Sequence, residues 1–196
     1  MKKVIPEDSV LVPDYAKRVF KGMIFDTYQW QQELFDGSEH TFEMLKRTDT
    51  VQVICVVDDK IIVLEDEQPH LGTRESFPGG RVDDSDLSIQ AAAQREMLEE
   101  TGYSFKQWRL ISVGQPYRKM EWFVYVLLAW DVIDQVPPKF DPGEKITLAK
   151  LEFADVKQKA PQRFGYLGGS FSIFKDIDSI EQLLDLPEFA GQTVDR

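Results

Sequence analysis

Apolar residues recur at every second position in several short segments of the chain, and at helical spacing in one longer segment. Residues 51–57 (VQVICVV) and 60–66 (KIIVLED) are two apolar runs on either side of Asp58 and Asp59. This pattern predicts a β-hairpin that is buried on at least one face. Residues 86–102 (DLSIQAAAQREMLEETG) instead carry Ala, Met and Leu at helical intervals. We expect a helix there, with Asp86 as its N-cap and Gly102 as the residue that ends it.

The first part of the chain predicts a small antiparallel sheet. Residues 18–26 (RVFKGMIFD) and 28–35 (YQWQQELF) mix aromatic, apolar and polar residues in rough alternation. Residues 36–40 (DGSEH) supply a turn before residues 41–46 (TFEMLK), so a second hairpin is expected. We therefore expect residues 1–45 to form an N-terminal antiparallel strand segment, separate from a domain that covers residues 46–196.

The pattern after the first apolar hairpin predicts further strands and two short helices. Residues 67–76 read as a loop that leads to the Pro-Gly-Gly of residues 78–80. Strands are expected at residues 107–113, 121–132 and 146–153, and short helices at residues 153–160 and 178–186. This order of strands, one well-marked helix, strands and helix indicates an α+β fold rather than repeated βαβ units.

Composition and charge narrow the functions that this chain can have. With 23 Lys and Arg against 34 Asp and Glu, the net charge of the 196 residues is −11. A chain this acidic lacks the basic surface of a nucleic-acid binder, so no polymeric DNA or RNA partner is expected. The single cysteine, Cys55, reads as a small core residue. No apolar run approaches the ~20 residues that span a bilayer, and the first residues lack the apolar core of a signal peptide. We expect a cytoplasmic protein with no membrane partner.

Three carboxylates crowd the end of the predicted helix. Glu96, Glu99 and Glu100 lie at positions i, i+3 and i+4, so their side chains share one face. Each like-charged pair at this spacing costs about 0.2–0.5 kcal/mol, and anions are unfavourable at a helix C-terminus. A bound cation would compensate for this cost, and a solvated acidic face is the alternative.

Residues 80–103 resemble the Nudix box of the Nudix hydrolases, which is written G-x5-E-x7-R-E-U-x-E-E-x-G-U with U a bulky aliphatic residue. Gly80 is the first glycine, and residues 95–97, 99, 100, 102 and 103 fill the second half in register. The first Glu of the box falls on Asp86, which eight residues rather than seven separate from Arg95. The resemblance implies a Nudix-type α/β/α sandwich with a mixed central sheet.

The resemblance to the Nudix family also implies a metal-dependent hydrolysis of phosphoanhydride bonds. Glu96 and Glu100 would be the principal ligands of Mg²⁺, with Mn²⁺ as a possible substitute. Glu99 would contribute directly or through water, and the backbone carbonyl of Gly79 would add a further ligand. Arg95 would hold the glutamates by ion pairs. Carboxylate oxygens are the ligands that Mg²⁺ prefers.

Features outside the box resemble the branch of the family that hydrolyses ADP-ribose and nucleotide sugars. Residues 141–146 (DPGEKI) resemble a late acidic loop, which implies that Glu144 activates water, with Glu99 the next base to test. The N-terminal strand segment resembles one that is often exchanged across a homodimer, so a homodimer is expected. The candidate substrate contacts are an aromatic pair that stacks the base and three phosphate contacts: Tyr28, Trp30, His70, Arg74 and Arg118.

The resemblance leaves other functions open. The box fits a Nudix enzyme that acts on nucleoside triphosphates, a nucleotide coenzyme or a capped RNA end, although the net charge disfavours the last. A nucleotide sensor without turnover is a third hypothesis, which the intact trio of glutamates disfavours. An α+β domain with a merely acidic helix is the fourth. Our preferred interpretation is a pyrophosphatase that acts on a small nucleoside diphosphate derivative.

Overall fold

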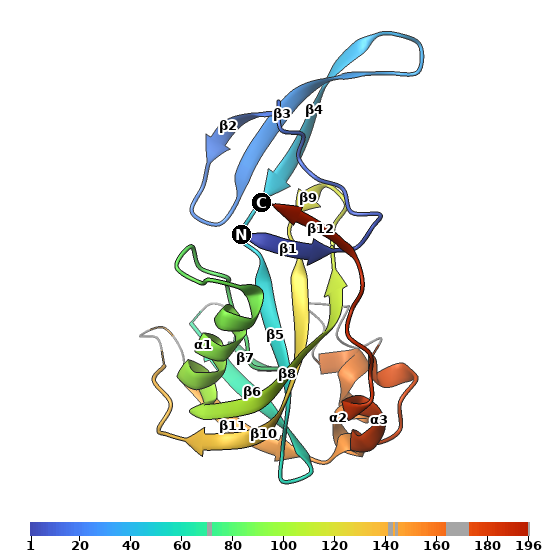
Figure 1. Ribbon diagram of the computed structural model, residues 1–196. Helices are drawn as coiled ribbons and strands as arrows, with labels where there is room; N and C mark the ends of the chain where they lie inside the picture. Colours follow the sequence, from blue (N-terminus) through green and yellow to red (C-terminus); the bar gives the residue numbers. More distant parts are fainter. Residues whose placement is uncertain (70–71, 141–142, 144, 164–172, 196) are drawn as a thin grey trace.

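A mixed β-sheet forms the centre of the computed structural model, which describes residues 1–69, 72–140, 143, 145–163 and 173–195 (Figure 1). The strand order is β11 (Lys145–Leu151), β6 (Lys60–Gln68), β5 (Thr50–Val57), β10 (Val124–Gln135) and β8 (Tyr103–Gly114), and β7 (Gly72–Ser76) also pairs with β6. Strands β5 and β10 are parallel, and the other pairs of this sheet are antiparallel. The predicted mixed sheet is confirmed.

The predicted apolar hairpin is formed by β5 and β6. Its two turn residues, Asp58 and Asp59, have φ of 54° and 57°. Asp tolerates this left-handed conformation better than most residues do, and two such residues in succession match the twist of a tight hairpin. Strand β5 is buried along its whole length, so both of its faces contact a core.

The alternation of side chains along β5 creates two separate cores. One face packs against helix α1 (Ile89–Thr101), and this core contains Val51, Val53, Cys55, Val57, Ala92, Ala93 and Met97. The other face packs against the start of α2 (Phe153–Arg163), the 3₁₀ helix Ile173–Lys175 and α3 (Ile180–Leu184), and this core contains Ile54, Val56, Phe153, Val156, Phe174 and Leu183. Because successive strand residues point to opposite faces, one run of β-branched residues serves both layers. The α/β/α sandwich is confirmed.

The N-terminal cap of α1 differs from the prediction, whereas its C-terminal end is as predicted. Ser88, not Asp86, is the N-cap, and its hydroxyl accepts a hydrogen bond of 3.0 Å from the N–H of Ala91. The predicted N-cap was wrong because the Asp86 carboxylate is bonded elsewhere, as described below. Gly102 ends the helix in the left-handed conformation, with φ of 73°, as expected.

The N-terminal residues form a sheet that extends away from the core (Figure 1). Its strands are β2 (Lys17–Lys21), β3 (Asp26–Glu33), β4 (Glu39–Lys46) and the short β9 (Met120–Glu121). The hairpin predicted around residues 36–40 is confirmed by the pairing of β3 with β4. A separate pair joins β1 (Lys2–Ile5) to β12 (Gln192–Asp195), so the two ends of the chain lie side by side.

Two buried carboxylates fasten the N-terminal residues to the core. Asp49 pairs with the ammonium of Lys3 at 2.6 Å, and Glu121 pairs with that of Lys46 at 2.5 Å. Glu121 also accepts a hydrogen bond of 2.7 Å from the N–H of Val12. These contacts fix the N-terminal segment relative to the sheet. Within the described residues, no helix is long and apolar enough to cross a membrane.

Candidate active site

A glycine pair brings the loop before α1 against both the sheet and the helix. A Cβ on Gly79, whose φ is 146°, would lie 2.1 Å from the carbonyl oxygen of Val51. A Cβ on Gly80 would lie 2.5 Å from Oε1 of Glu96. At Gly79 the neighbour is backbone, so only a residue without a side chain allows this approach, whereas at Gly80 the neighbour is the end of a flexible side chain. The N–H of Gly79 donates a hydrogen bond of 2.7 Å to Oε2 of Glu100, so the loop also orients a glutamate of the helix.

Arg95 lies at the centre of the acidic cluster. Its guanidinium donates to both carboxylate oxygens of Asp86, at 3.2 and 3.0 Å. It also donates to Glu96 at 2.9 Å, to Glu99 at 3.1 Å and to the carbonyl oxygen of Arg81 at 2.8 Å. The rigid fork of arginine suits this role, since its donors point in fixed directions. The predicted pairing of Arg95 with the helix glutamates is present in the structure.

Asp86, which stands at the altered position of the box, pairs with Arg95. Asp86 lies two residues before the N-cap Ser88, in the loop, and it also accepts a hydrogen bond of 2.8 Å from the N–H of Asp83. Asp86 thus reaches Arg95 from the loop although eight residues separate the two. The hydrogen bonds from Arg95 lower the pKa of Asp86, and the same bonds raise the pKa of Arg95. Both groups stay charged at neutral pH.

The three helix glutamates line one pocket of about 350 Å³. Its lining residues are Gly79, Gly80, Arg81, Asp83, Arg95, Glu96, Glu99, Glu100 and Lys139, and we call it the carboxylate pocket. The side chain of Glu96 is 14% exposed and that of Glu99 is 47% exposed, while Glu100 is buried. The predicted ligand set, which includes Gly79, is therefore gathered in one place.

The oxygen ligands of the carboxylate pocket are of the kind that binds a divalent cation. In this structure the carboxylate oxygens accept hydrogen bonds from protein groups. Hard carboxylate oxygens on one helix face match the preference of Mg²⁺. Within the described residues, however, no three acidic, His or Cys side chains are grouped as ready ligands around one point. The hydrogen bonds from Arg95 and Gly79 explain this, because they hold the carboxylates toward protein donors.

A second pocket of about 590 Å³ adjoins the first and combines arginines with aromatic rings. Its lining residues include Phe25, Arg47, Arg74, Arg81, Tyr117 and Trp122, and we call it the arginine pocket. Arg81 lines both pockets. The guanidinium of Arg47 lies over the ring of Trp122, 4.6 Å from its centroid, and 5.5 Å from that of Phe25. Such a stack holds a planar cation among aromatic faces.

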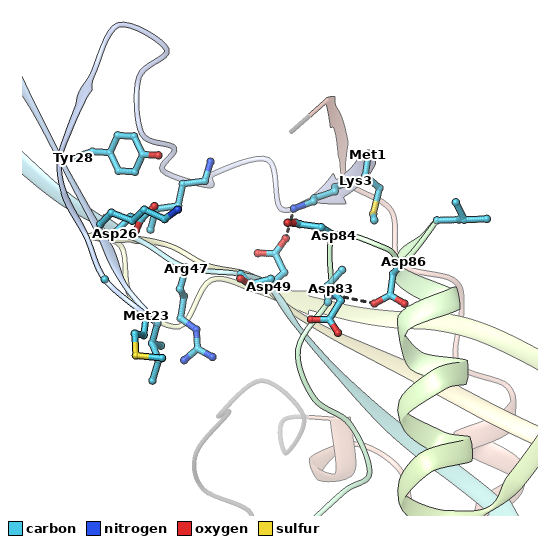
Figure 2. A pocket seen from close by; sticks show the side chains of 17 residues that line it. Met1, Lys3, Met23, Asp26, Tyr28, Arg47, Asp49, Asp83, Asp84 and Asp86 are labelled. Carbon is cyan, nitrogen blue, oxygen red and sulfur yellow. Dashed lines mark hydrogen bonds and ion pairs between the residues drawn. The ribbon is translucent and has the colours of Figure 1, made fainter. Parts of the chain in front are cut away.

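A third pocket, of about 790 Å³, lies between the N-terminal strands and the loop before α1. Figure 2 shows Asp26 and Tyr28 from the N-terminal strands on one side and Asp84 and Asp86 from the loop on the other. Arg47 belongs to the linings of both this pocket and the arginine pocket. Asp83 lines both this pocket and the carboxylate pocket, so each of the three pockets shares a lining residue with the other two.

The structure brings some predicted substrate contacts to these pockets and leaves others elsewhere. Arg74 lines the arginine pocket and Tyr28 the third pocket. Trp30 contacts the ring of Phe42 at 5.8 Å between centroids, and it is not among the residues that line these three pockets. Arg118 lies outside them as well and pairs with exposed Asp8. His70 and Glu144 lie outside the described residues.

Sequence reasoning missed the residues that join the pockets. Arg81 directly follows the glycine pair, so its place beside the box is a signal that was available. Arg47 and Trp122 are far apart in the sequence, and the pairings of β4 with β9 and of β5 with β10 bring their segments together. No local pattern marks such a pair.

Comparison with known proteins identifies the family. A sequence model of the NUDIX domain matches residues 46–167, which is more than half of the 196 residues. The chain belongs to the NUDIX family. It is 31% identical over 93 residues to the ADP-ribose pyrophosphatase of Bacillus subtilis (strain 168), an alignment that covers 46% of this chain and 50% of that protein. The chain thus spans about half the length of this curated relative.

A solved structure supports the fold. The crystal structure of an ADP compounds hydrolase superposes with a TM-score of 0.62 at 17% sequence identity, and the match covers 82% of this chain and 85% of the other. At this identity the similarity shows a shared fold alone. It extends over more of the chain than the NUDIX domain match does.

Proposed function

We propose that this protein hydrolyses the pyrophosphate bond of a nucleoside diphosphate that is linked to another group. ADP-ribose or a nucleotide sugar is the preferred substrate, and a nucleoside monophosphate and a sugar phosphate are the products. One observation carries the proposal: a pocket of helix glutamates adjoins a pocket of arginines and aromatic rings through the shared Arg81. Membership of the NUDIX family and similarity to a relative named as an ADP-ribose pyrophosphatase support it.

The arginine pocket has the chemistry that such a substrate requires. Arg74 and Arg81 offer guanidinium donors, which suit phosphate oxygens. Tyr117, which is 59% exposed, stacks on the buried ring of Trp122 with ring centroids 6.4 Å apart, and the ring of Tyr117 would offer an aromatic face to a base. Because the whole chain carries a charge of −11, an anionic substrate depends on local cations of this sort.

A divalent cation, Mg²⁺ or Mn²⁺, completes the proposed site. Glu96, Glu99, Glu100 and the backbone carbonyl of Gly79 would hold it in the carboxylate pocket. When bound, such an ion neutralises phosphate oxygens and acidifies a water molecule. Arg95 positions Glu96 and Glu99 through the hydrogen bonds already described.

Glu144 remains our proposed general base. Its loop follows β10, and Lys145, the next residue, begins β11, which pairs with β6 of the central sheet. We expect Glu144→Gln to lower kcat by about 10²–10⁴-fold, the usual range for general-base catalysis, with KM nearly unchanged. A kcat within about threefold of wild type would transfer the role to Glu99.

A substrate panel tests the proposed function. Wild-type protein is incubated with ADP-ribose, nucleotide sugars, dinucleotide coenzymes and nucleoside triphosphates, each with Mg²⁺ or Mn²⁺, and the nucleoside monophosphate is measured by chromatography. We expect release of the monophosphate from the first two classes and its loss in Glu100→Gln, because that change removes a proposed ligand. Faster turnover of triphosphates or coenzymes favours the alternative Nudix activity. Tight binding without turnover of any compound indicates a nucleotide sensor instead.

We also propose that the protein acts as a homodimer through its N-terminal strand segment. Several large apolar side chains of this segment are exposed: Val19, Phe20, Met23, Ile24 and Phe35. Exposed apolar side chains of this size are candidates for burial against a second subunit. Met23 and Ile24 also line the arginine pocket and the third pocket, so a second subunit there would lie beside the substrate.

A further inference from the structure

The segment after β10 is fastened to the last turn of α1. The N–H of Val136 donates to the carbonyl oxygen of Gly102 at 2.9 Å, and the N–H of Lys139 donates to that of Glu99 at 2.8 Å. The last carbonyl groups of a helix have no partner within the helix. These bonds therefore give a partner to the helix carbonyl groups and to the N–H groups of the segment after β10. Lys139 is thereby attached directly to the backbone of a proposed metal-binding residue.

The backbone between these two anchors has little freedom. Pro137 and Pro138 separate Val136 from Lys139, and each proline fixes its own φ. Gly102 allows the close approach of this segment, since a Cβ there would lie 1.8 Å from the carbonyl oxygen of Val136. The position of the Lys139 backbone is therefore set before any ligand arrives, and only its side chain has to be ordered.

Lys139 brings a third cation to the carboxylate pocket. The pocket is lined by four carboxylates, Asp83, Glu96, Glu99 and Glu100, and by three cations, Arg81, Arg95 and Lys139. Arg81 and Arg95 are both paired with carboxylates, whereas no ion pair of Lys139 occurs within the described part of the chain. Its ammonium group carries three donors on a flexible stem, so it is able to meet an incoming anion.

We propose that Lys139 is a substrate-binding residue that contacts an oxygen of the diphosphate at the mouth of the carboxylate pocket. This inference rests on the proposed function, because it needs an anionic diphosphate beside the glutamates. A cation near the C-terminal end of a helix is also stabilised by the helix dipole. That purely structural role predicts an effect on stability and none on ligand affinity, so the two roles are separable.

Binding measurements without turnover test this role. The probes are an α,β-methylene analogue of ADP-ribose, which resists hydrolysis, and inorganic pyrophosphate, each titrated calorimetrically with Mg²⁺ present. We expect Lys139→Met to weaken binding of both about 10- to 100-fold, as loss of one hydrogen bond between charged groups does. Lys139→Arg should remain within about threefold of wild type. Lys106, an exposed lysine on β8 that lines none of the three pockets, supplies the matched control Lys106→Met, which should bind normally.

The outcomes separate this inference from the proposed function. If wild type hydrolyses nothing in the panel but Lys139→Met still weakens the binding of pyrophosphate, the function fails and the role of Lys139 stands. If wild type hydrolyses ADP-ribose and Lys139→Met binds the analogue within about twofold of wild type, the role of Lys139 is refuted and the function stands. Failure of wild type to bind either probe refutes the role, as does a Lys139→Met variant that loses Mg²⁺-induced thermal stabilisation.

Discussion

Because Gly80 lies against Glu96, the substitution Gly80→Ala tests whether the position of Glu96 matters for activity. In Gly80→Ala the new Cβ would lie 2.5 Å from Oε1 of Glu96, so the carboxylate has to move. Because that atom is the end of a flexible side chain, we expect the melting temperature to change little. Displacement of a proposed ligand should lower kcat/KM by about 10- to 100-fold, the usual cost of disturbing a metal site.

Gly114→Ala provides the control for this prediction. A Cβ at Gly114 would meet no atom within 4 Å, and the residue lies at the end of β8. Its kinetics with ADP-ribose should equal those of wild type. Equal kinetics for Gly80→Ala as well would mean that the position of Glu96 does not limit the reaction.

The Asp86–Arg95 pair should make the thermal stability of the protein depend on pH in the acid range. The pKa of Asp86 is lowered by its hydrogen bonds to Arg95. A carboxylate of this kind stabilises the fold fully above its unfolded pKa, about 3.9, and loses that contribution as pH falls through its lower native value. The melting temperature of wild type should therefore exceed that of Asp86→Asn at pH 7. We expect the difference to persist near pH 5 and to shrink as the pH falls below the unfolded pKa and Asp86 becomes protonated in the folded state. A difference that stays constant down to pH 2 would contradict this account of the pair.

At the level of single residues, the sequence was informative wherever the chemistry is local. Helical spacing places the three glutamates on one face and puts Arg95 four residues before Glu99, within reach of its carboxylate. The prediction of Asp86 as the N-cap was wrong, because an acid before a helix serves equally well as a cap or as an ion-pair partner. Arg47 and Trp122 meet only through the tertiary fold, so no spacing rule reaches them.

At the level of elements, the junction between α1 and the segment after β10 depends on Gly102. Gly102→Ala would force an L side chain to adopt a φ of 73° and place its Cβ 1.8 Å from the carbonyl oxygen of Val136. We expect a loss of more than about 1 kcal/mol in the free energy of unfolding, measured by urea denaturation. Binding of pyrophosphate should weaken too, because Lys139 moves with this segment.

Gly37→Ala separates backbone strain from the clash. Gly37 also has a positive φ, of 83°, but a Cβ there would meet no atom within 4 Å. This control should lose only the strain energy and keep normal binding. If the two variants are equally destabilised, the contact with Val136 contributes nothing.

The elements that the sequence predicted well are those with a buried face. Strand β5 and helix α1 show a clear period because a core lies beside them. Strand β7 (Gly72–Ser76) was interpreted as a loop, and β1 and β12 were not anticipated. These strands are short, and β7 and β12 carry mostly polar residues. Their pairing joins backbones without an apolar stripe, so periodicity does not reveal them.

At the level of the whole molecule, the exposed N-terminal strand segment predicts the oligomeric state. We expect wild type to sediment as a homodimer at micromolar concentration, and Phe20→Asp to weaken the dimer at least about tenfold, because it would place a charge in an apolar contact. Phe20 is 61% exposed in the single chain, and Ile133 on β10, 65% exposed, provides the matched control Ile133→Asp. A wild type that is monomeric and fully active would refute the dimer.

The pairing of β1 with β12 also has a consequence for the order of folding. It joins residues 2–5 to residues 192–195, almost the full length of the chain apart. Contacts between such distant positions close slowly, and a nascent chain cannot form them until the later partner has been synthesised. Met1 and Lys3, beside this pair, line the third pocket. Helix α1 is therefore able to fold on the sheet while translation continues, whereas this pocket wall is completed only after residues 192–195 have been synthesised.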